Sequence, residues 1–201
     1  MITTIIFDIG NVLTDYTWRE HIEKKGFHGD MLERIANATV KSEQWKEYDR
    51  GILSDEEIME SFVQNDPEIE QEIRKAFEDK KHIVARRDYV IPWIRKLKEN
   101  KYRVLYLSNF SYRASIECEA ALDFIPYTDG GILSYRDHLV KPMPEIYSLL
   151  IERYELIPEE CVFLDDVEEN IRAAQPFGIH TILYENQKQA IEELRKLGVD
   201  A

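Results

Sequence analysis

Cysteines, basic leaders and long apolar runs are scarce or missing in this sequence. Its 201 residues include two cysteines, Cys118 and Cys161, whose spacing fits neither a CxxC motif nor a metal-ligand pattern. The opening MITTIIF carries no basic leader, and no apolar run approaches the ~20 residues of a membrane span. We therefore expect reduced, buried thiols in a cytoplasmic protein that has no membrane partner.

Positive charge is also in short supply. The 26 basic residues against 39 acidic ones give a net charge of −13. This balance argues against a nucleic-acid partner, which requires clustered lysine and arginine. An apolar share of 44% is too high for a disordered chain. The length suits one compact unit, or one core that carries an insertion.

Strand and helix patterns alternate along most of the chain. Short β-branched and aromatic runs alternate with amphipathic stretches, which is typical of parallel strands joined by helices. We therefore predict an α/β fold, a Rossmann-like, doubly wound parallel sheet. Strands are expected at 3–7, 102–107, 130–134, 161–164 and 179–184, and helices at 89–100, 112–122, 144–154, 168–177 and 187–198.

The segment 16–85 has a different texture, highly charged and helical in period. Ser54 and Glu57 form a capping-box pattern at the start of one helix, and Gly51 ends the helix before it. We expect three to five short helices and no convincing strand. The predicted organisation is a core of residues 1–15 and 86–201 with an inserted all-helical cap domain, residues 16–85.

Polar residues of one chemical kind follow the predicted strands. Functional groups in a doubly wound sheet gather beyond the carboxyl ends of its strands. Each of these residues alone is more typical of a turn, a helix cap or a solvated surface. Their joint placement at one sheet edge is what indicates a site. The residues are Asp8, Ser108, Asn109, Lys141, Asp165, Asp166 and Asn170.

These residue types suggest phosphoryl chemistry. Three carboxylates at one edge would repel one another and need a hard cation such as Mg²⁺. Lys141 would add positive charge, while Ser108 and loop N–H groups could hold a phosphate. Asp8, beside metal and phosphate, would be a plausible nucleophile that forms an aspartyl-phosphate.

Four motifs resemble those of the haloacid dehalogenase superfamily of hydrolases. They are FDIGNVL (7–13), YLSN (106–109), KP (141–142) and FLDDVEEN (163–170). The similarity covers essentially the whole chain, the helical insertion included. The first motif and DRGILSDEEI (49–58) look most like the small bacterial, helical-cap group that includes α-D-glucose-1-phosphate phosphatases.

The resemblance implies a Mg²⁺-dependent phosphatase acting on a small phosphorylated metabolite, such as a sugar phosphate. Asp8 would be the nucleophile and a metal ligand. The carbonyl of Gly10 and the carboxylate of Asp166 would complete the protein ligands, with Asp165 supporting the metal through water or hydrogen bonds.

The resemblance also implies a phosphate site. Ser108 and Asn109 would bind the phosphoryl group, and Lys141 would bridge it to the nucleophile. We also expect Gly10, Asn11 and Arg113 to contact phosphate or substrate.

One position departs from the family pattern. Most phosphatases of this family carry a second aspartate two residues after the nucleophile, where it protonates the leaving group and later activates water. Gly10 occupies that position here. Another group could substitute, the substrate could leave unaided, or turnover could be slow. Asp15 is a candidate substitute, although it could equally cap the first helix of the cap.

The cap is expected to set specificity by closing over the site. Trp45 and Tyr48 are more typical of packing between cap helices, whereas His21 and Arg50 are expected at the surface. Tyr112 could face substrate or lie on a helix surface. The cap side chains of interest are Trp18, His21, Trp45, Tyr48 and Arg50.

Other functions remain open at this point. A 2-haloacid dehalogenase would use Asp8 without metal, but the Asp165-Asp166 pair would hinder halide release. A phosphomutase would miss the acid at Gly10. A non-catalytic metal- or phosphate-binding protein would tolerate Gly10. We expect a monomer or homodimer.

Overall fold

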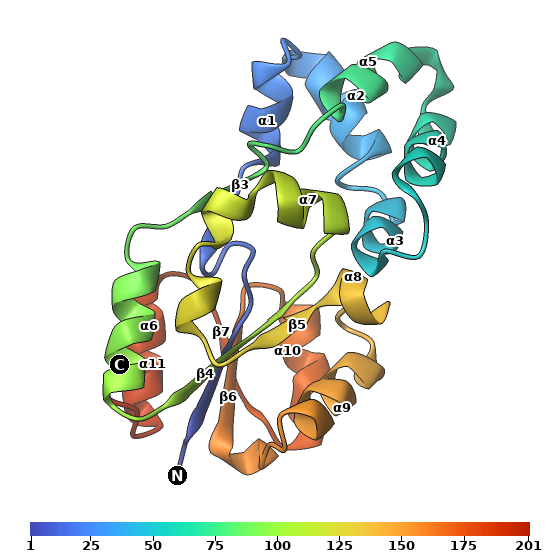
Figure 1. The fold of residues 1–201 in the computed structure, drawn as a ribbon. Coiled ribbons are helices and arrows are strands. Elements are labelled where there is room, and N and C mark those ends of the chain that lie inside the picture. Colours follow the sequence, from blue (N-terminus) through green and yellow to red (C-terminus); the bar gives the residue numbers. More distant parts are fainter.

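A computed structural model describes residues 1–201, which form a layered core beneath a group of short helices (Figure 1). A five-stranded sheet lies at the centre of the core, in the order β5-β4-β1-β6-β7, with every neighbouring pair parallel. The predicted doubly wound sheet is confirmed. Its strands are β1 (Thr4–Phe7), β4 (Arg103–Ser108), β5 (Gly131–Leu133), β6 (Cys161–Asp165) and β7 (His180–Leu183).

Both faces of the sheet are covered because the central strands are apolar on both sides. The core helices are α6 (Val90–Glu99), α7 (Tyr112–Glu117), α8 (Ser134–Asp137), α9 (Pro144–Arg153), α10 (Glu168–Ala174) and α11 (Gln187–Lys196). Ile5 and Phe7 of β1 belong to the apolar cluster on the side of α6 and α11, whereas Ile6 belongs to the cluster under α9 and α10.

Five helices make up the cap. The capping box is present: Glu57 N–H donates to Ser54 Oγ, and Ser54 N–H donates to the Glu57 carboxylate at 2.8 Å. Gly51 ends the preceding helix in the left-handed region, at φ 70°. The helices are α1 (Trp18–Lys24), α2 (Gly29–Ala38), α3 (Gln44–Arg50), α4 (Asp55–Asn65) and α5 (Glu70–Ala76).

Aromatic side chains fill the interior of the cap. The Trp45 ring lies 5.4 Å from Tyr48, 5.8 Å from Phe62 and 5.7 Å from Phe77, centroid to centroid. Trp45 and Tyr48 therefore pack between cap helices, the interpretation that the sequence favours.

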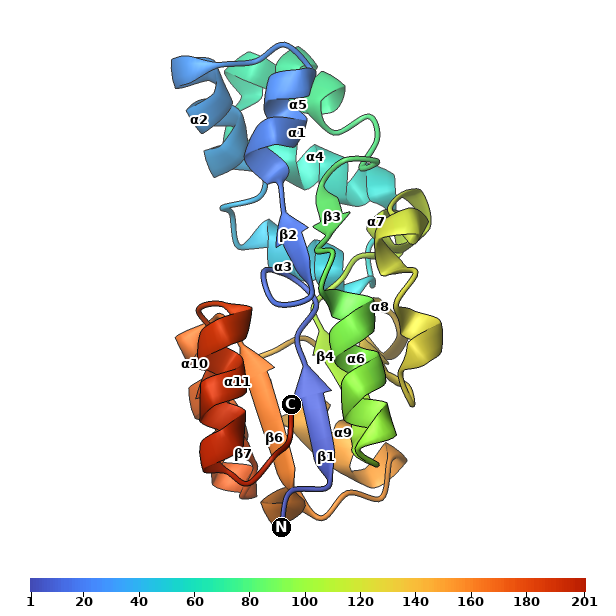
Figure 2. The ribbon, with the colours of Figure 1, turned by 90° about the vertical axis from the view of Figure 1, so that its left-hand side faces the viewer.

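Two short strands were not expected between residues 14 and 86. β2 (Thr14–Tyr16) and β3 (Val84–Arg86) pair antiparallel and connect the core to the cap (Figure 2). The expectation that 16–85 contains no strand is wrong. A strand of three residues is too short to show an alternating pattern in the sequence. The pairing of β2 with β3 is therefore visible only in the folded chain, where the two segments that link core and cap lie side by side. None of the helices is both long and apolar enough to span a membrane.

Candidate active site

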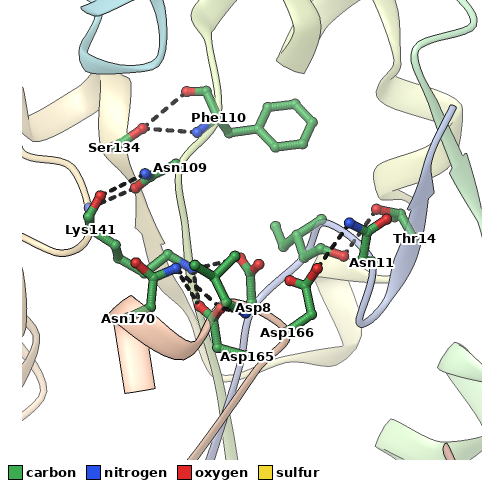
Figure 3. A network of polar contacts seen from close by, with 12 residues as sticks. Asp8, Asn11, Thr14, Asn109, Phe110, Ser134, Lys141, Asp165, Asp166 and Asn170 are labelled. Atoms are coloured by element: carbon green, nitrogen blue, oxygen red, sulfur yellow. Dashed lines mark hydrogen bonds and ion pairs between the residues drawn. The ribbon is translucent and has the colours of Figure 1, made fainter. Parts of the chain in front are cut away.

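The polar strand ends meet at one edge of the sheet, beneath the cap (Figure 3). Asp8 follows β1, Asp165 ends β6, and their side chains converge with that of Lys141 from the loop before α9. Parallel strands bring their carboxyl ends to a common edge, so residues more than 130 positions apart become neighbours.

Lys141 is buried between two carboxylates. Its Nζ lies 2.8 Å from Asp8 Oδ1 and 2.6 Å from Asp165 Oδ2, with only 2% of the residue exposed. Asn109 fixes the loop: its amide donates to Lys141 O at 3.0 Å, and its Oδ1 accepts from Lys141 N at 2.7 Å. The Asn109 side chain therefore positions Lys141, and the backbone N–H of Asn109 remains for a phosphate.

Asp165 is fully buried and saturated with donors. Its carboxylate accepts from Lys141, from Val167 N–H at 2.8 Å and from the Asn170 amide at 3.1 and 3.0 Å. Tyr147 donates to the Asn170 carbonyl at 3.0 Å and so anchors the start of α10. Asp165 thus holds Lys141 in place.

Asp166 is more open than Asp165. It is half-buried, and its Oδ2 accepts from the Asn11 amide at 3.0 Å. Asn11 Oδ1 in turn accepts from Tyr16 N–H at 3.2 Å. The side chain of Asn11 therefore joins Asp166 to the strand that leads into the cap.

Negative charge exceeds positive charge at this edge. Burial raises the pKa of Asp8 to about 7; Lys141 opposes this shift, whereas Asp165 adds to it. Burial lowers the pKa of Lys141, but the two carboxylates outweigh it and the net shift is upward. Burial also raises the pKa of Asp166. Single carboxylate oxygens of Asp8, Asp165 and Asp166 all lie within 4.8 Å of one another.

A cavity of about 210 Å³ lies between this edge and the cap. Asp8, Gly10 and Asp166 line its core side, and Lys141 and Asp165 lie directly behind them; we call these five residues the floor. Tyr16, Trp45 and Asp49 form the cap side, which we call the roof. The remaining lining residues are Asn11, Ile83, Val84, Asn109, Phe110, Ser111, Ala114 and Val167.

Comparison with known proteins decides the family. The family model described as haloacid dehalogenase-like hydrolase matches residues 2–178. The chain is a haloacid dehalogenase-like hydrolase. Mammalian relatives that are 32–37% identical match about half of the chain or less, and only 10–15% of their own length. Among them is mouse bifunctional epoxide hydrolase 2, at 37% identity over 84 residues.

A curated bacterial relative and a solved bacterial structure both match this hydrolase over nearly its whole length. D-ribitol-5-phosphate phosphatase of Bacteroides thetaiotaomicron is 27% identical, with 96% of this chain and 97% of that protein covered. The crystal structure of a family enzyme from the same organism, in complex with magnesium and inorganic phosphate, has a TM-score of 0.71 at 24% identity. It covers 94% of this chain and 99% of that chain.

The geometry corrects the expectation for Arg113. Its guanidinium pairs with Glu117 at 2.7 Å and donates to the Glu78 carbonyl, so it joins α7 to the cap and does not line the cavity. Tyr112 is 61% exposed. Arg113 and Tyr112 are close to Asn109 in sequence, but α7 directs their side chains away from the cavity.

Asp15 is neither a substitute acid in the cavity nor a helix cap. Its carboxylate pairs with Arg87 Nε at 2.7 Å, outside the cavity lining. Thr17 occupies the N-cap position of α1.

Three of the cap side chains of interest do not line the cavity, and two of them differ from the expected exposure. His21, expected at the surface, is buried and its Nε2 lies 2.9 Å from Ala76 O. Arg50, expected in solvent, donates from Nε to His138 O at 3.1 Å and so joins cap to core. Trp18 lies beneath Arg19 and is not part of the cavity.

The sequence-based reasoning missed two roof residues, Asp49 and Tyr16. Asp49 begins the stretch DRGILSDEEI that resembles the family, yet a helical carboxylate in a charged segment gives no sign of its direction. Burial and the Asp8 charge raise the pKa of Asp49 to about 8, against the opposing effect of Lys141. The Tyr16 hydroxyl is buried without a hydrogen-bond partner.

Proposed function

We propose that this hydrolase is a Mg²⁺-dependent phosphatase that hydrolyses a small phosphorylated metabolite through an aspartyl-phosphate on Asp8. The observation that carries the proposal is the buried cluster of Asp8, Lys141 and Asp165 beside the open carboxylate of Asp166. The likeness to a D-ribitol-5-phosphate phosphatase supports a sugar or polyol phosphate as substrate.

The donor set suits a hard divalent cation. Three carboxylates have oxygens within 4.8 Å of one another, and one lysine cannot neutralise them all. We assign Asp8, Asp166 and the carbonyl of Gly10 as ligands, with Asp165 in support because both its oxygens already accept hydrogen bonds. When bound, Mg²⁺ supplies charge neutralisation for the transferring phosphoryl group.

Backbone donors around Asp8 suit the phosphoryl oxygens. Gly10, Asn11 and Asn109 line the cavity, and no hydrogen bond within the protein uses their backbone N–H groups. Ser108, buried at the end of β4, contributes to stabilising the Asp8 carboxylate. A cluster of free N–H groups is a preorganised anion site.

The chain's own groups then divide the reaction into two steps. A carboxylate oxygen of Asp8 bonds to phosphorus while the bond from phosphorus to the leaving oxygen breaks. Lys141 favours the ionised form of Asp8 and offsets the charge on the phosphoryl oxygens. Water next attacks phosphorus, which breaks the Asp8–phosphorus bond and releases inorganic phosphate. The roof encloses the reacting group and limits the substrate to a small one.

A panel of esters tests this proposal. Wild type and Asp8→Asn are assayed with hexose 1- and 6-phosphates, polyol phosphates and an aryl phosphate, each with Mg²⁺ and with EDTA. We expect phosphate release by wild type that EDTA stops and that Asp8→Asn, folded by circular dichroism, lacks. Turnover that persists in EDTA, or halide release from 2-chloropropionate without phosphate release from any ester, would contradict the proposal.

A further inference from the structure

The missing acid at position 10 leaves a specific gap in the proposed phosphatase reaction, on which this inference rests. An alkoxide leaving group needs a proton, and Gly10 has none to give. Steric exclusion does not explain the glycine. A Cβ at this position would meet only Asp8 Oδ2, at 3.9 Å, and the backbone φ is not positive.

Asp49 brings a second carboxyl residue to the cavity from the cap. It lines the cavity from α3, close enough to Asp8 for the two charges to interact. Its carboxyl group makes no ion pair and no hydrogen bond within the protein, although every other carboxylate lining this cavity has a partner. A partly buried carboxyl left free in this way is available to a bound ester.

Hydrogen bonds between cap and core fix Asp49 in that position. Ser134 Oγ donates to Asp49 O at 2.5 Å, and Arg50 Nε donates to His138 O at 3.1 Å. His138 Nδ1 also lies 3.0 Å from Arg50 O. Gly51 allows the close approach, since a Cβ there would lie 2.8 Å from Tyr135 Cβ. The end of α3 is therefore held against α8.

We propose that Asp49 is the general acid and base of this hydrolase, in place of the aspartate absent at position 10. In the first step the Asp49 carboxyl gives its proton to the leaving oxygen as the phosphorus–oxygen bond breaks and the Asp8–phosphorus bond forms. In the second step the Asp49 carboxylate takes a proton from the water that attacks phosphorus. Asp8 and phosphate are released, and Asp49 is again protonated.

The surroundings of Asp49 suit both roles. The titratable and charged groups that face it are Asp8 and Lys141 from the core and Tyr16 from β2. Burial and Asp8 raise the pKa of Asp49 to about 8, so the acid form is populated at neutral pH. The unpartnered Tyr16 hydroxyl on the same wall could bind a hydroxyl of the leaving group.

Leaving-group dependence tests the proposal directly. Wild type, Asp49→Asn and Asp15→Asn are assayed on an alkyl phosphate, such as a hexose 6-phosphate, and on p-nitrophenyl phosphate. We expect Asp49→Asn to lose roughly 10²- to 10⁴-fold in kcat/KM on the alkyl ester and less than about tenfold on the aryl ester, whose leaving group needs little protonation. The comparison uses kcat/KM because the second step, in which Asp49 acts as base, is common to both esters and lowers kcat for both. Asp15→Asn, outside the cavity, should match wild type on both.

Two further readouts distinguish chemistry from packing. The kcat/KM of wild type on the alkyl ester should fall as pH rises through the pKa of Asp49, and Asp49→Asn should lack that limb. The double variant Gly10→Asp/Asp49→Asn should regain alkyl phosphatase activity.

Each outcome decides between the two proposals. Equal losses of kcat/KM by Asp49→Asn on both esters, or no loss on either, would overturn the role of Asp49 as the acid and leave the phosphatase intact. Failure of wild type to hydrolyse any ester would overturn both.

Discussion

The floor and the roof of the cavity treat their polar groups differently. In the floor, Lys141 contacts two carboxylates and Asp165 receives donors from three residues. In the roof, the Asp49 carboxyl and the Tyr16 hydroxyl have no hydrogen-bond partner in the protein. The floor is preorganised, whereas the roof leaves groups free for a substrate.

This contrast predicts two kinds of variant. Changes in the floor should affect every phosphate ester alike, because all esters present the same phosphoryl group. The effects of changes in the roof should depend on the ester, because the roof faces the leaving group, which differs from one ester to another.

The largest expected effect is that of Lys141→Met. It removes the cation from between Asp8 and Asp165 and leaves two buried carboxylates without a positively charged partner. Unfolding by urea should show a loss of about 3–5 kcal/mol, and kcat should fall roughly 10³-fold on alkyl and aryl esters alike. Lys188→Met, at an exposed position, is the control. A loss of kcat confined to one class of ester would contradict the distinction between floor and roof.

Gly51→Ala should weaken the contact between α3 and α8. Its φ of 70° disfavours alanine, and the new Cβ would lie 2.8 Å from Tyr135 Cβ. We expect about 1 kcal/mol of destabilisation and a larger fall of kcat/KM on alkyl than on aryl phosphates. Gly26→Ala is the control that separates the cost of a positive φ from the cost of the clash with Tyr135. At Gly26 φ is 92°, but nothing lies within 4 Å of an added Cβ. If both variants lose kcat/KM on alkyl and aryl phosphates in the same ratio, the contact between α3 and α8 does not position Asp49.

Tyr16→Phe should affect binding without a cost in stability. The hydroxyl has no partner, so its removal should leave the free energy of unfolding unchanged or raise it by up to about 1 kcal/mol. KM for a sugar phosphate should rise severalfold, and KM for an aryl phosphate should not. Tyr184→Phe is the matched control: its hydroxyl lies 2.6 Å from that of Tyr89, so its loss should destabilise the fold. An unchanged sugar phosphate KM would argue against a substrate contact.

A smaller effect concerns pH and the interior of the cap. Burial lowers the pKa of His21 below its ordinary 6.5, although the Ala76 carbonyl opposes the shift. The unfolded chain therefore binds a proton that the folded chain does not, and stability falls as pH drops below 6.5 toward the folded pKa.

Urea unfolding of wild type and His21→Gln between about pH 7.5 and 5.5 measures this slope. His21→Gln should flatten it, whereas His180→Gln, at an exposed position, should not. An unchanged slope in His21→Gln would assign the pH dependence to other groups.

The sequence predicted the sheet and most of the floor for a clear physical reason. β1 and β6 are buried on both faces, so their apolar runs stand out, and the polar residues that follow them must meet at the carboxyl edge. Asp8, Lys141, Asp165 and Asp166 come together as that logic requires.

The roof escaped prediction because it depends on how the cap is oriented. Asp49 and Tyr16 reach the cavity only through β2–β3 pairing and the α3–α8 contact, which are properties of the folded chain. Arg113 failed for the converse reason: it is close to Asn109 in sequence, but its helix directs it to Glu117.

Trapping the intermediate would test the central claim most directly. Wild type is mixed with p-nitrophenyl phosphate and Mg²⁺ and quenched in acid within one turnover. The protein is then digested, and the masses of its peptides are measured by mass spectrometry. The account predicts one phosphoryl group on the peptide that contains Asp8, absent with EDTA and absent from Asp8→Asn. Turnover without that adduct, together with phosphatase activity retained by Asp8→Asn, would contradict it.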